Sequence, residues 1–264
     1  MFPLRKRPTI EPKRPPGAME WWTRSVGSQD RTDEIGVLMA RLRTGIERAA
    51  ACECPVFLRL LGRDLERELE ALSIARRTGL GDSTAEPMKR YAHLEDLVDY
   101  YCDAVMPWSK ATRAVELSDA VREAVAGLSG DLTLVLRVEG EPSIVASRRA
   151  LIALCEVTIR AATPSVDQDV EVVLPRCAAT DAELRVMWTP ADVSEATTRE
   201  GSRFLALALA YALKLKATVR RIRGAQDGLV VRIPVNQGGG KDMSANLCFD
   251  SDVVADATAF CLEG

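Results

Sequence analysis

Histidine and asparagine are nearly missing from this chain of 264 residues. His93 is its one histidine, and its asparagines all lie at position 236 or later. A Ser-His-Asp triad is therefore excluded, because a single histidine in a loose context has no partner groups to form it. The sequence also lacks a Walker-type phosphate-binding loop and a basic helix of the kind that reads duplex DNA.

The chain has no long hydrophobic run. None reaches the roughly 18–20 residues that a membrane span needs, and the basic N-terminus lacks the apolar stretch of a secretory signal. The seven cysteines are scattered, and Cys52 and Cys54 stand too close together for a usual zinc site. We therefore expect a cytoplasmic protein with free, buried thiols and no bound metal.

The composition is that of an ordinary globular protein, with 47% apolar residues, 28% charged residues and a net charge of -3. A chain of this length holds one large domain or two compact ones, and its charge favours neither nucleic acid nor a membrane as partner. Residues 1–30 predict a disordered, basic, proline-rich tail. Its Trp21 and Trp22 either contact a partner helix or a lipid surface, or cap the first helix. Membrane contact by this tail has no other support in the sequence.

Residues 31–110 carry the pattern of two long amphipathic helices. Thr32 suits a helix start, and apolar residues recur at three-four spacing before and after Pro55 and again from Tyr91 to Val105. Pro55 either kinks the first helix or restarts it. One hairpin cannot cover its own apolar stripe, so the pattern predicts a homodimer in which two hairpins form a four-helix bundle.

Residues 111–236 change to short alternating segments. Strands are expected over 132–138, 170–174, 184–188, 219–222 and 229–233, and helices over 115–128, 143–162 and 201–216. This order predicts a mixed sheet with helices on one face, and hence an α+β fold for the whole chain. Gly238 to Gly240 open a flexible C-terminal tail, 237–264, that is either loose or docked in a groove.

Several segments resemble, in order, parts of the two-component sensor histidine kinases. Residues 33–42 resemble the end of a HAMP signal-transmitting helix, and residues 57–65 resemble the phosphoacceptor segment. Residues 148–163 resemble the N-box helix of the GHKL ATPases. Residues 201–219 resemble their G2 segment, and residues 230–234 resemble their closing strand. The resemblance covers residues 32 to 235. It implies a dimerisation hairpin followed by an α/β sandwich of the GHKL ATPase (Bergerat) type.

The resemblance places Arg63 at the phosphoacceptor position, with Asp64 as its acidic neighbour. A guanidinium stays protonated and cannot attack phosphorus, so ordinary autophosphorylation at this position is excluded. Arg63 and Asp64 also fit a solvated pair on a helix face. His93 is the other candidate phosphoacceptor, although Leu94 rather than an acid follows it. It equally fits a surface or rim residue.

The implied nucleotide pocket is degenerate. Glu156 matches the N-box glutamate, but Val157 stands where the family has a magnesium-binding asparagine, and no asparagine lies between 130 and 235. Trp188 stands in the segment where the family has glycines. Gly201 is kept, and Arg203 alone could meet a phosphate at that helix start. We therefore expect that ATP and magnesium binding are lost and that no cofactor is bound.

Three functions follow from this pattern. The first is a non-catalytic, pseudokinase-like homodimeric adaptor that binds a response-regulator receiver domain or a partner histidine kinase. Its docking face would carry Arg59, Arg63, Glu66, Arg67 and Glu70, which also fit a merely solvated face. The second is a histidine phosphotransferase or divergent kinase that uses His93. The third is an anti-sigma-like partner-switching protein, against which the long helices of residues 32–106 argue.

Overall fold

A computed structural model describes residues 30–52, 54–78, 85–107, 112–128, 134–162, 170–176, 180–189, 195–224, 226–235 and 249–261. Trp21, Trp22 and the rest of the predicted tail up to residue 29 lie outside the described residues. No helix within the described ranges has the length and apolar character to cross a membrane.

The N-terminal half is a bundle of three helices: α2 (Asp30–Ala51), α3 (Val56–Arg77) and α4 (Ala85–Val105). Pro55 stands directly before α3 with an extended backbone, at φ -49° and ψ 147°. Since proline has no N–H to donate and clashes with the preceding turn, the chain ends one helix and starts another there. The restart, and not the kink, is therefore correct, and the expected pair of long helices is wrong.

The apolar faces predicted for this region are covered within one chain. Leu42 of α2, Leu61 and Leu65 of α3, and Leu94 and Leu97 of α4 are all fully buried. Three helices close a core that two could not. The uncovered stripe from which the sequence predicts a dimer is thus absent from the described residues.

The C-terminal half is an α/β layer. Its five-stranded sheet has the order β2 (Leu134–Val138), β4 (Val170–Leu174), β5 (Asp181–Trp188), β7 (Asp227–Pro234) and β6 (Thr218–Ile222). β2 and β4 are parallel, and the other neighbours are antiparallel. The buried positions of β4 and β5 alternate, as the period of a strand requires, whereas β7 has a run of four buried residues from Gly228 to Val231. The predicted α+β class, with a mixed sheet and helices on one face, is confirmed.

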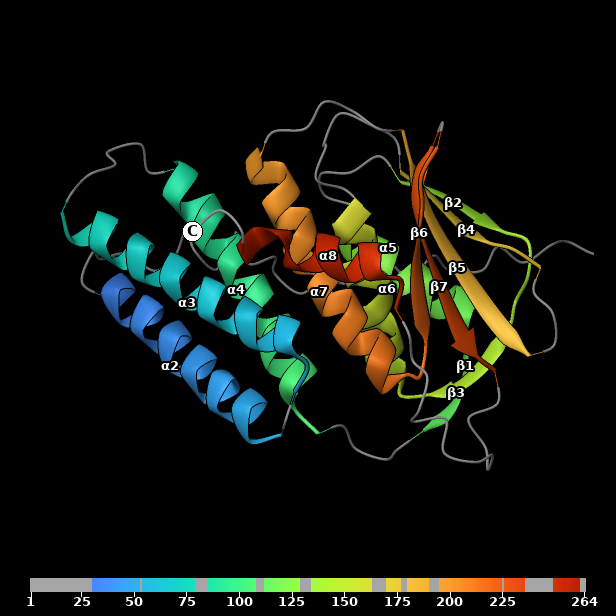
Figure 1. The fold of residues 1–264 in the computed structure, drawn as a ribbon, viewed down its shortest axis with the longest axis horizontal. Coiled ribbons are helices and arrows are strands. Elements are labelled where there is room, and N and C mark those ends of the chain that lie inside the picture. The colour runs from blue at the N-terminus through green and yellow to red at the C-terminus, as the bar shows by residue number, and fades with distance from the viewer. Residues whose placement is uncertain are drawn as a thin grey trace, which may run out of the picture.

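Helices α5 (Leu117–Leu128), α6 (Arg148–Ala162) and α7 (Glu195–Lys214) cover that face, between the sheet and the bundle (Figure 1). Residues 201–212 of α7 are all buried. A helix segment that is buried all round must be covered on every side, and α6, α8, α3 and α4 all contact α7. α7 is therefore the element on which the two halves of the chain meet.

Two elements depart from the sequence-based prediction. The helix expected from 143 begins instead at Arg148, because Ser143–Ala146 forms a strand, β3, paired with β1 (Arg113–Glu116). The tail expected to be flexible contains helix α8 (Ser251–Thr258) and a 3₁₀ turn (Ala259–Cys261). Val253, Ala257 and Phe260 are buried as this segment crosses α7 from β6 toward α3 (Figure 1). Of the two alternatives for the tail, the described part is docked.

We predict that Gly62→Ala destabilises the bundle by about 1–3 kcal/mol, because it overpacks the contact between α3 and α4. A methyl group at Gly62 would lie 2.5 Å from Tyr101 Oη and 2.8 Å from Ile46 Cγ1. Gly36→Ala is the matched control, since a methyl group there meets nothing within 4 Å. It should stabilise the exposed helix by roughly 0.5–1 kcal/mol. Urea denaturation of both variants tests this, and midpoint shifts in the same direction would contradict it.

Candidate functional site

Asp64 lies where the bundle meets α7, and it is only 5% exposed. Its neighbour Arg63 is exposed. Successive helix residues point about 100° apart, so one turns toward α7 and the other toward solvent. The two residues therefore do not form the solvated pair considered from the sequence.

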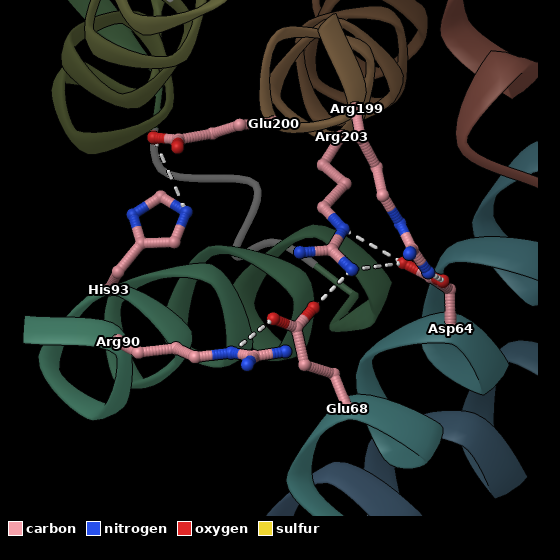
Figure 2. Close-up of polar contacts among 7 residues, drawn as sticks. All are labelled: Asp64, Glu68, Arg90, His93, Arg199, Glu200 and Arg203. Carbon is pink, nitrogen blue, oxygen red and sulfur yellow. Dashed lines mark hydrogen bonds and ion pairs between the residues drawn. The ribbon is translucent and has the colours of Figure 1, made fainter. Parts of the chain in front are cut away.

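Two arginines from the start of α7 hold the Asp64 carboxylate (Figure 2). Arg203 Nε donates to Oδ2 at 2.8 Å, and Arg199 pairs with Oδ1. The side chains of Asp64 and Arg203 are 7% and 5% exposed. A charge this deep is tolerated only when it is paired, and removal of one partner from such a pair typically costs about 3–5 kcal/mol. Arg203, which the sequence offered to a phosphate, is engaged by a carboxylate of the chain itself.

Glu68 extends the cluster by one helical turn. It contacts Arg203 on one side and accepts a 2.9 Å hydrogen bond from Arg90 of α4 on the other. Burial alone would raise the pKa of Glu68, but Arg203 and Arg90 outweigh it and hold that pKa below its ordinary value. The cluster thus joins α3, α4 and α7 through charged groups.

His93 sits beside this cluster, on the face of α4 that meets α7. Its Nε2 lies 3.4 Å from Glu200 Oε1, and its ring stands edge-on to Phe204 with centroids 5.6 Å apart. Burial lowers the pKa of His93; Arg160 and Arg203 act in the same direction, and Glu200 and Asp96 act against it. The imidazole is therefore mostly neutral near pH 7, and its side chain is 25% exposed.

The residues of the predicted nucleotide pocket do not converge. Val157 is fully buried in the core, Gly201 is buried inside α7, and Trp188 ends β5. Glu156 accepts a 2.8 Å hydrogen bond from Tyr100 of α4. Burial raises the pKa of Glu156, although the Tyr100 bond and Arg160 oppose the shift. Together with Arg203, these positions are spread over separate contacts.

A cavity of about 750 Å³ opens between α4 and the first half of α6. Of the predicted pocket residues, Glu156 alone lines it. The other side chains around it include Arg148 and Arg149, which are paired with Glu123 and Asp103. Its charged groups therefore largely satisfy one another.

The predicted docking residues divide into two sets. Glu66 and Glu70 both pair with Arg43 of α2, the first at 2.7 Å and the second at 3.3 Å. Arg59, Arg63 and Arg67 are exposed, and no described residue forms an ion pair with them. The acids belong to the bundle's own contacts, and the arginines are left facing solvent.

Sequence reasoning missed the partners of Asp64, although a signal was present. Asp64 and Glu68 are four residues apart, and so are Arg199 and Arg203. Residues at this spacing share a helix face, so two acids on one helix matched two bases on another. Nothing in either segment says that the two helices meet, because 135 residues separate Asp64 from Arg199.

No family model and no curated protein matches the sequence. Solved structures do. The histidine kinase AdeS of Acinetobacter baumannii aligns over 66% of this chain and 97% of that one, at 12% identity and a TM-score of 0.48. The histidine kinase domain of the blue-light activated EL346 from Erythrobacter litoralis aligns over 78% of this chain and 95% of that one, at 16% identity and a TM-score of 0.39. A histidine kinase of Burkholderia phymatum aligns over 73% of this chain and 98% of that one, at 14% identity and a TM-score of 0.38.

These structures are histidine kinases, the family that the sequence resembles. Every one of the three TM-scores lies below 0.5, so the likenesses carry no argument about the activity of this chain. What can be argued comes from its own contacts.

We predict that His93 weakens the fold as the pH falls below about 7. Its folded-state pKa lies below the ordinary value of 6.5, so the unfolded chain binds more protons in this range and stability falls with pH. The free energy of unfolding of the parent chain, relative to His93→Gln, should therefore decrease from pH 7 to pH 5 and stay constant above pH 7. Urea denaturation of both proteins across this range measures the difference. NMR titration of the chain's one imidazole supplies the pKa, and a value above that of free histidine would contradict the prediction.

Proposed function

We propose that this chain is a non-catalytic, histidine-kinase-like signalling adaptor of the two-component type. It binds an acidic surface of a response-regulator receiver domain, or of a partner kinase, through the outer face of α3. The observation that carries this proposal is the arginine stripe formed by Arg59, Arg63 and Arg67, which are exposed and form no ion pair with any residue that the structure describes.

The arginine stripe follows one side of the helix. Its members are four residues apart and so lie one above the other. Like charges at this spacing repel and destabilise the helix slightly, so the stripe does not contribute to the stability of the fold. Val56 and Ile74, 59% and 60% exposed, lie toward the two ends of the same helix. A row of guanidiniums with apolar contacts near its ends suits a partner that offers carboxylates.

The non-catalytic part of the proposal is supported by the positions of the candidate catalytic groups. A nucleotide site needs open oxygen donors and free cations. Glu156 is bonded to Tyr100, and Arg203 is buried against Asp64. Each of these groups would have to break an existing contact before it could meet ATP.

We expect that Arg63→Glu with Arg67→Glu weakens binding to a receiver domain by about tenfold or more at low salt, chiefly through slower association. Binding to a panel of purified receiver domains is measured by biolayer interferometry at two ionic strengths. Arg113→Glu with Arg220→Glu is the matched control, because it makes the same change in net charge at exposed positions outside α3. Equal losses in the two double variants, or no loss in the first, would argue against a docking role for the stripe.

We also expect that magnesium and an unhydrolysable ATP analogue give no binding heat and no thermal stabilisation at millimolar concentration. A ligand that binds only the folded state must raise the unfolding temperature. Isothermal calorimetry and a thermal melt of the full chain measure both quantities. Micromolar binding would overturn the non-catalytic proposal and leave the arginine stripe to be judged separately.

Phosphotransfer at His93 is the second candidate function. It is favoured by a neutral imidazole with a carboxylate, Glu200, 3.4 Å from Nε2, an arrangement that can activate a nucleophile. The test is transfer of phosphate from a phosphorylated receiver domain to the parent chain but not to His93→Gln. Absence of acid-labile phosphate on the parent chain ends this candidate.

No surface among the described residues carries the homodimer that the sequence predicts. The apolar faces of α2, α3 and α4 are occupied within one chain. The homodimer therefore stays a prediction, and sedimentation of the full chain tests it.

A further inference from the structure

Two cysteines and a lysine gather at one end of the helical bundle. Cys52 follows the last residue of α2, Cys54 lies two residues before the start of α3, and both are free thiols. Lys214 is the last residue of α7, and its Nζ donates to the carbonyl of Met106 at 2.7 Å and to that of Asp103 at 3.3 Å. The lysine therefore lies over the C-terminal end of α4.

Contacts through Met106 bring the cysteines to the same place. The carbonyl of Met106 accepts from Lys214, and its sulfur contacts Arg48 Nη1 at 2.7 Å. The carbonyl of Arg48 in turn accepts from the backbone N–H of Cys52 at 2.9 Å. The connection between α2 and α3 thus meets the ends of α4 and α7, and it carries a thiol on either side of residue 53.

The amine of Lys214 is suited to act as a nucleophile. Burial lowers its pKa to about 8, while Asp103, Cys54 and Cys52 oppose the shift. A lysine whose pKa is lowered by burial is a common nucleophilic amine in proteins. A neutral amine has two N–H groups, which suffice for the carbonyls of Asp103 and Met106, and one lone pair, which remains for an electrophile.

The thiols differ in how they can be reached. Cys52 is exposed, whereas Cys54 is half-buried. Burial raises the pKa of Cys54; Cys52 adds to the shift, and Lys214 and Arg59 oppose it. A raised pKa leaves less of the reactive thiolate. A bulky reagent in solvent therefore meets Cys52 first, and the half-buried amine of Lys214 is reached more easily from Cys52 than from solvent.

We propose that Cys52 and Lys214 form an acyl-relay site, in which Cys52 takes an acyl group from a small thioester and passes it to Lys214 Nζ. Two thiols alone would suit disulfide exchange, and the amine beside them is what favours acyl transfer. The site is separate from the arginine stripe of α3, so the proposal holds whether or not α3 binds a receiver domain.

The relay has two balanced steps. The Cys52 thiolate attacks the carbonyl carbon of the thioester, the bond from that carbon to the donor's sulfur breaks, and the donor leaves as a thiolate. The lone pair of Lys214 Nζ then attacks the same carbon, and the bond to Cys52 Sγ breaks. An amide forms, and the proton that the nitrogen releases goes to the Cys52 thiolate. The thiol is regenerated, and no oxidant is consumed.

Acylation changes the contacts of Lys214. The product is uncharged and keeps one N–H, so it can serve only one of the carbonyls of Asp103 and Met106. The other carbonyl is left to water, and Asp103 loses a neighbouring cation. The relay would therefore change the end of α4 at the point where this helix meets α7.

The probe is acetyl-coenzyme A, added to the full reduced chain at pH 8 and followed by peptide mass spectrometry. Lys214 should be acetylated about tenfold faster, or more, than Lys89, an exposed lysine near the other end of α4. Cys52→Ser should lower the rate at Lys214 to that at Lys89. Cys102→Ser is the matched control and should leave the rate unchanged, because the Cys102 thiol donates to the carbonyl of Arg41.

Lys214→Arg separates the two steps. Arginine keeps N–H donors for both carbonyls and stays protonated, so it cannot take the acyl group. An acetyl thioester should then accumulate on Cys52 and be removed by hydroxylamine, whereas the acetyl group of the parent chain should resist hydroxylamine. Circular dichroism confirms that each variant is folded.

Three results would overturn the relay: acetylation of Lys214 no faster than that of Lys89, an unchanged rate in Cys52→Ser, or no labile acetyl group on Cys52 in Lys214→Arg. Loss of the reaction in folded Cys54→Ser but not in Cys52→Ser would reject Cys52 as the acceptor.

Discussion

The contact on which this architecture depends is a carboxylate buried between two guanidiniums. Asp64 belongs to α3, and its partners Arg199 and Arg203 belong to α7. Because an unpaired charge at that depth costs several kilocalories per mole, few placements of α3 on α7 are acceptable. Glu68 and Arg90 then carry the same constraint to α4. The ionic cluster therefore adds a second constraint on the register of three helices, beside the close packing of their apolar faces.

The same constraint separates the faces of α3. Asp64 and Glu68 form ion pairs with α7, and Leu61 and Leu65 pack in the bundle core. The exposed arginines of α3 contact neither. A helix with three distinct faces can contact the rest of the chain and a separate partner at the same time. Contact with α7 and contact with a partner then use different side chains.

The sequence predicted most of the local structure because the local signals were strong. Leu61, Leu65 and Leu94 recur at helical spacing and are buried as expected, and the strand at 170–174 appears with the predicted limits. Pro55 could not be resolved from sequence, since a kink and a restart have the same local cause. The ion pairs of Asp64 with Arg199 and Arg203 could not be predicted for another reason: ion pairs between distant segments leave no periodicity in the sequence. Helix α8 was missed because eight residues with two buried positions are too few to register as a pattern.

The covered apolar core changes what kind of recognition is open to this chain. Recognition through an apolar stripe would bury large areas and tolerate salt, but the described side chains of α2, α3 and α4 leave no such stripe exposed. The exposed groups on α3 are mainly charged, and interactions between exposed charges are screened within about 10 Å at 0.1 M salt. Charge of this kind steers association and selects partners more than it holds them. An adaptor built this way would form short-lived complexes chosen by charge pattern, which suits a component that relays a signal better than one that anchors an assembly.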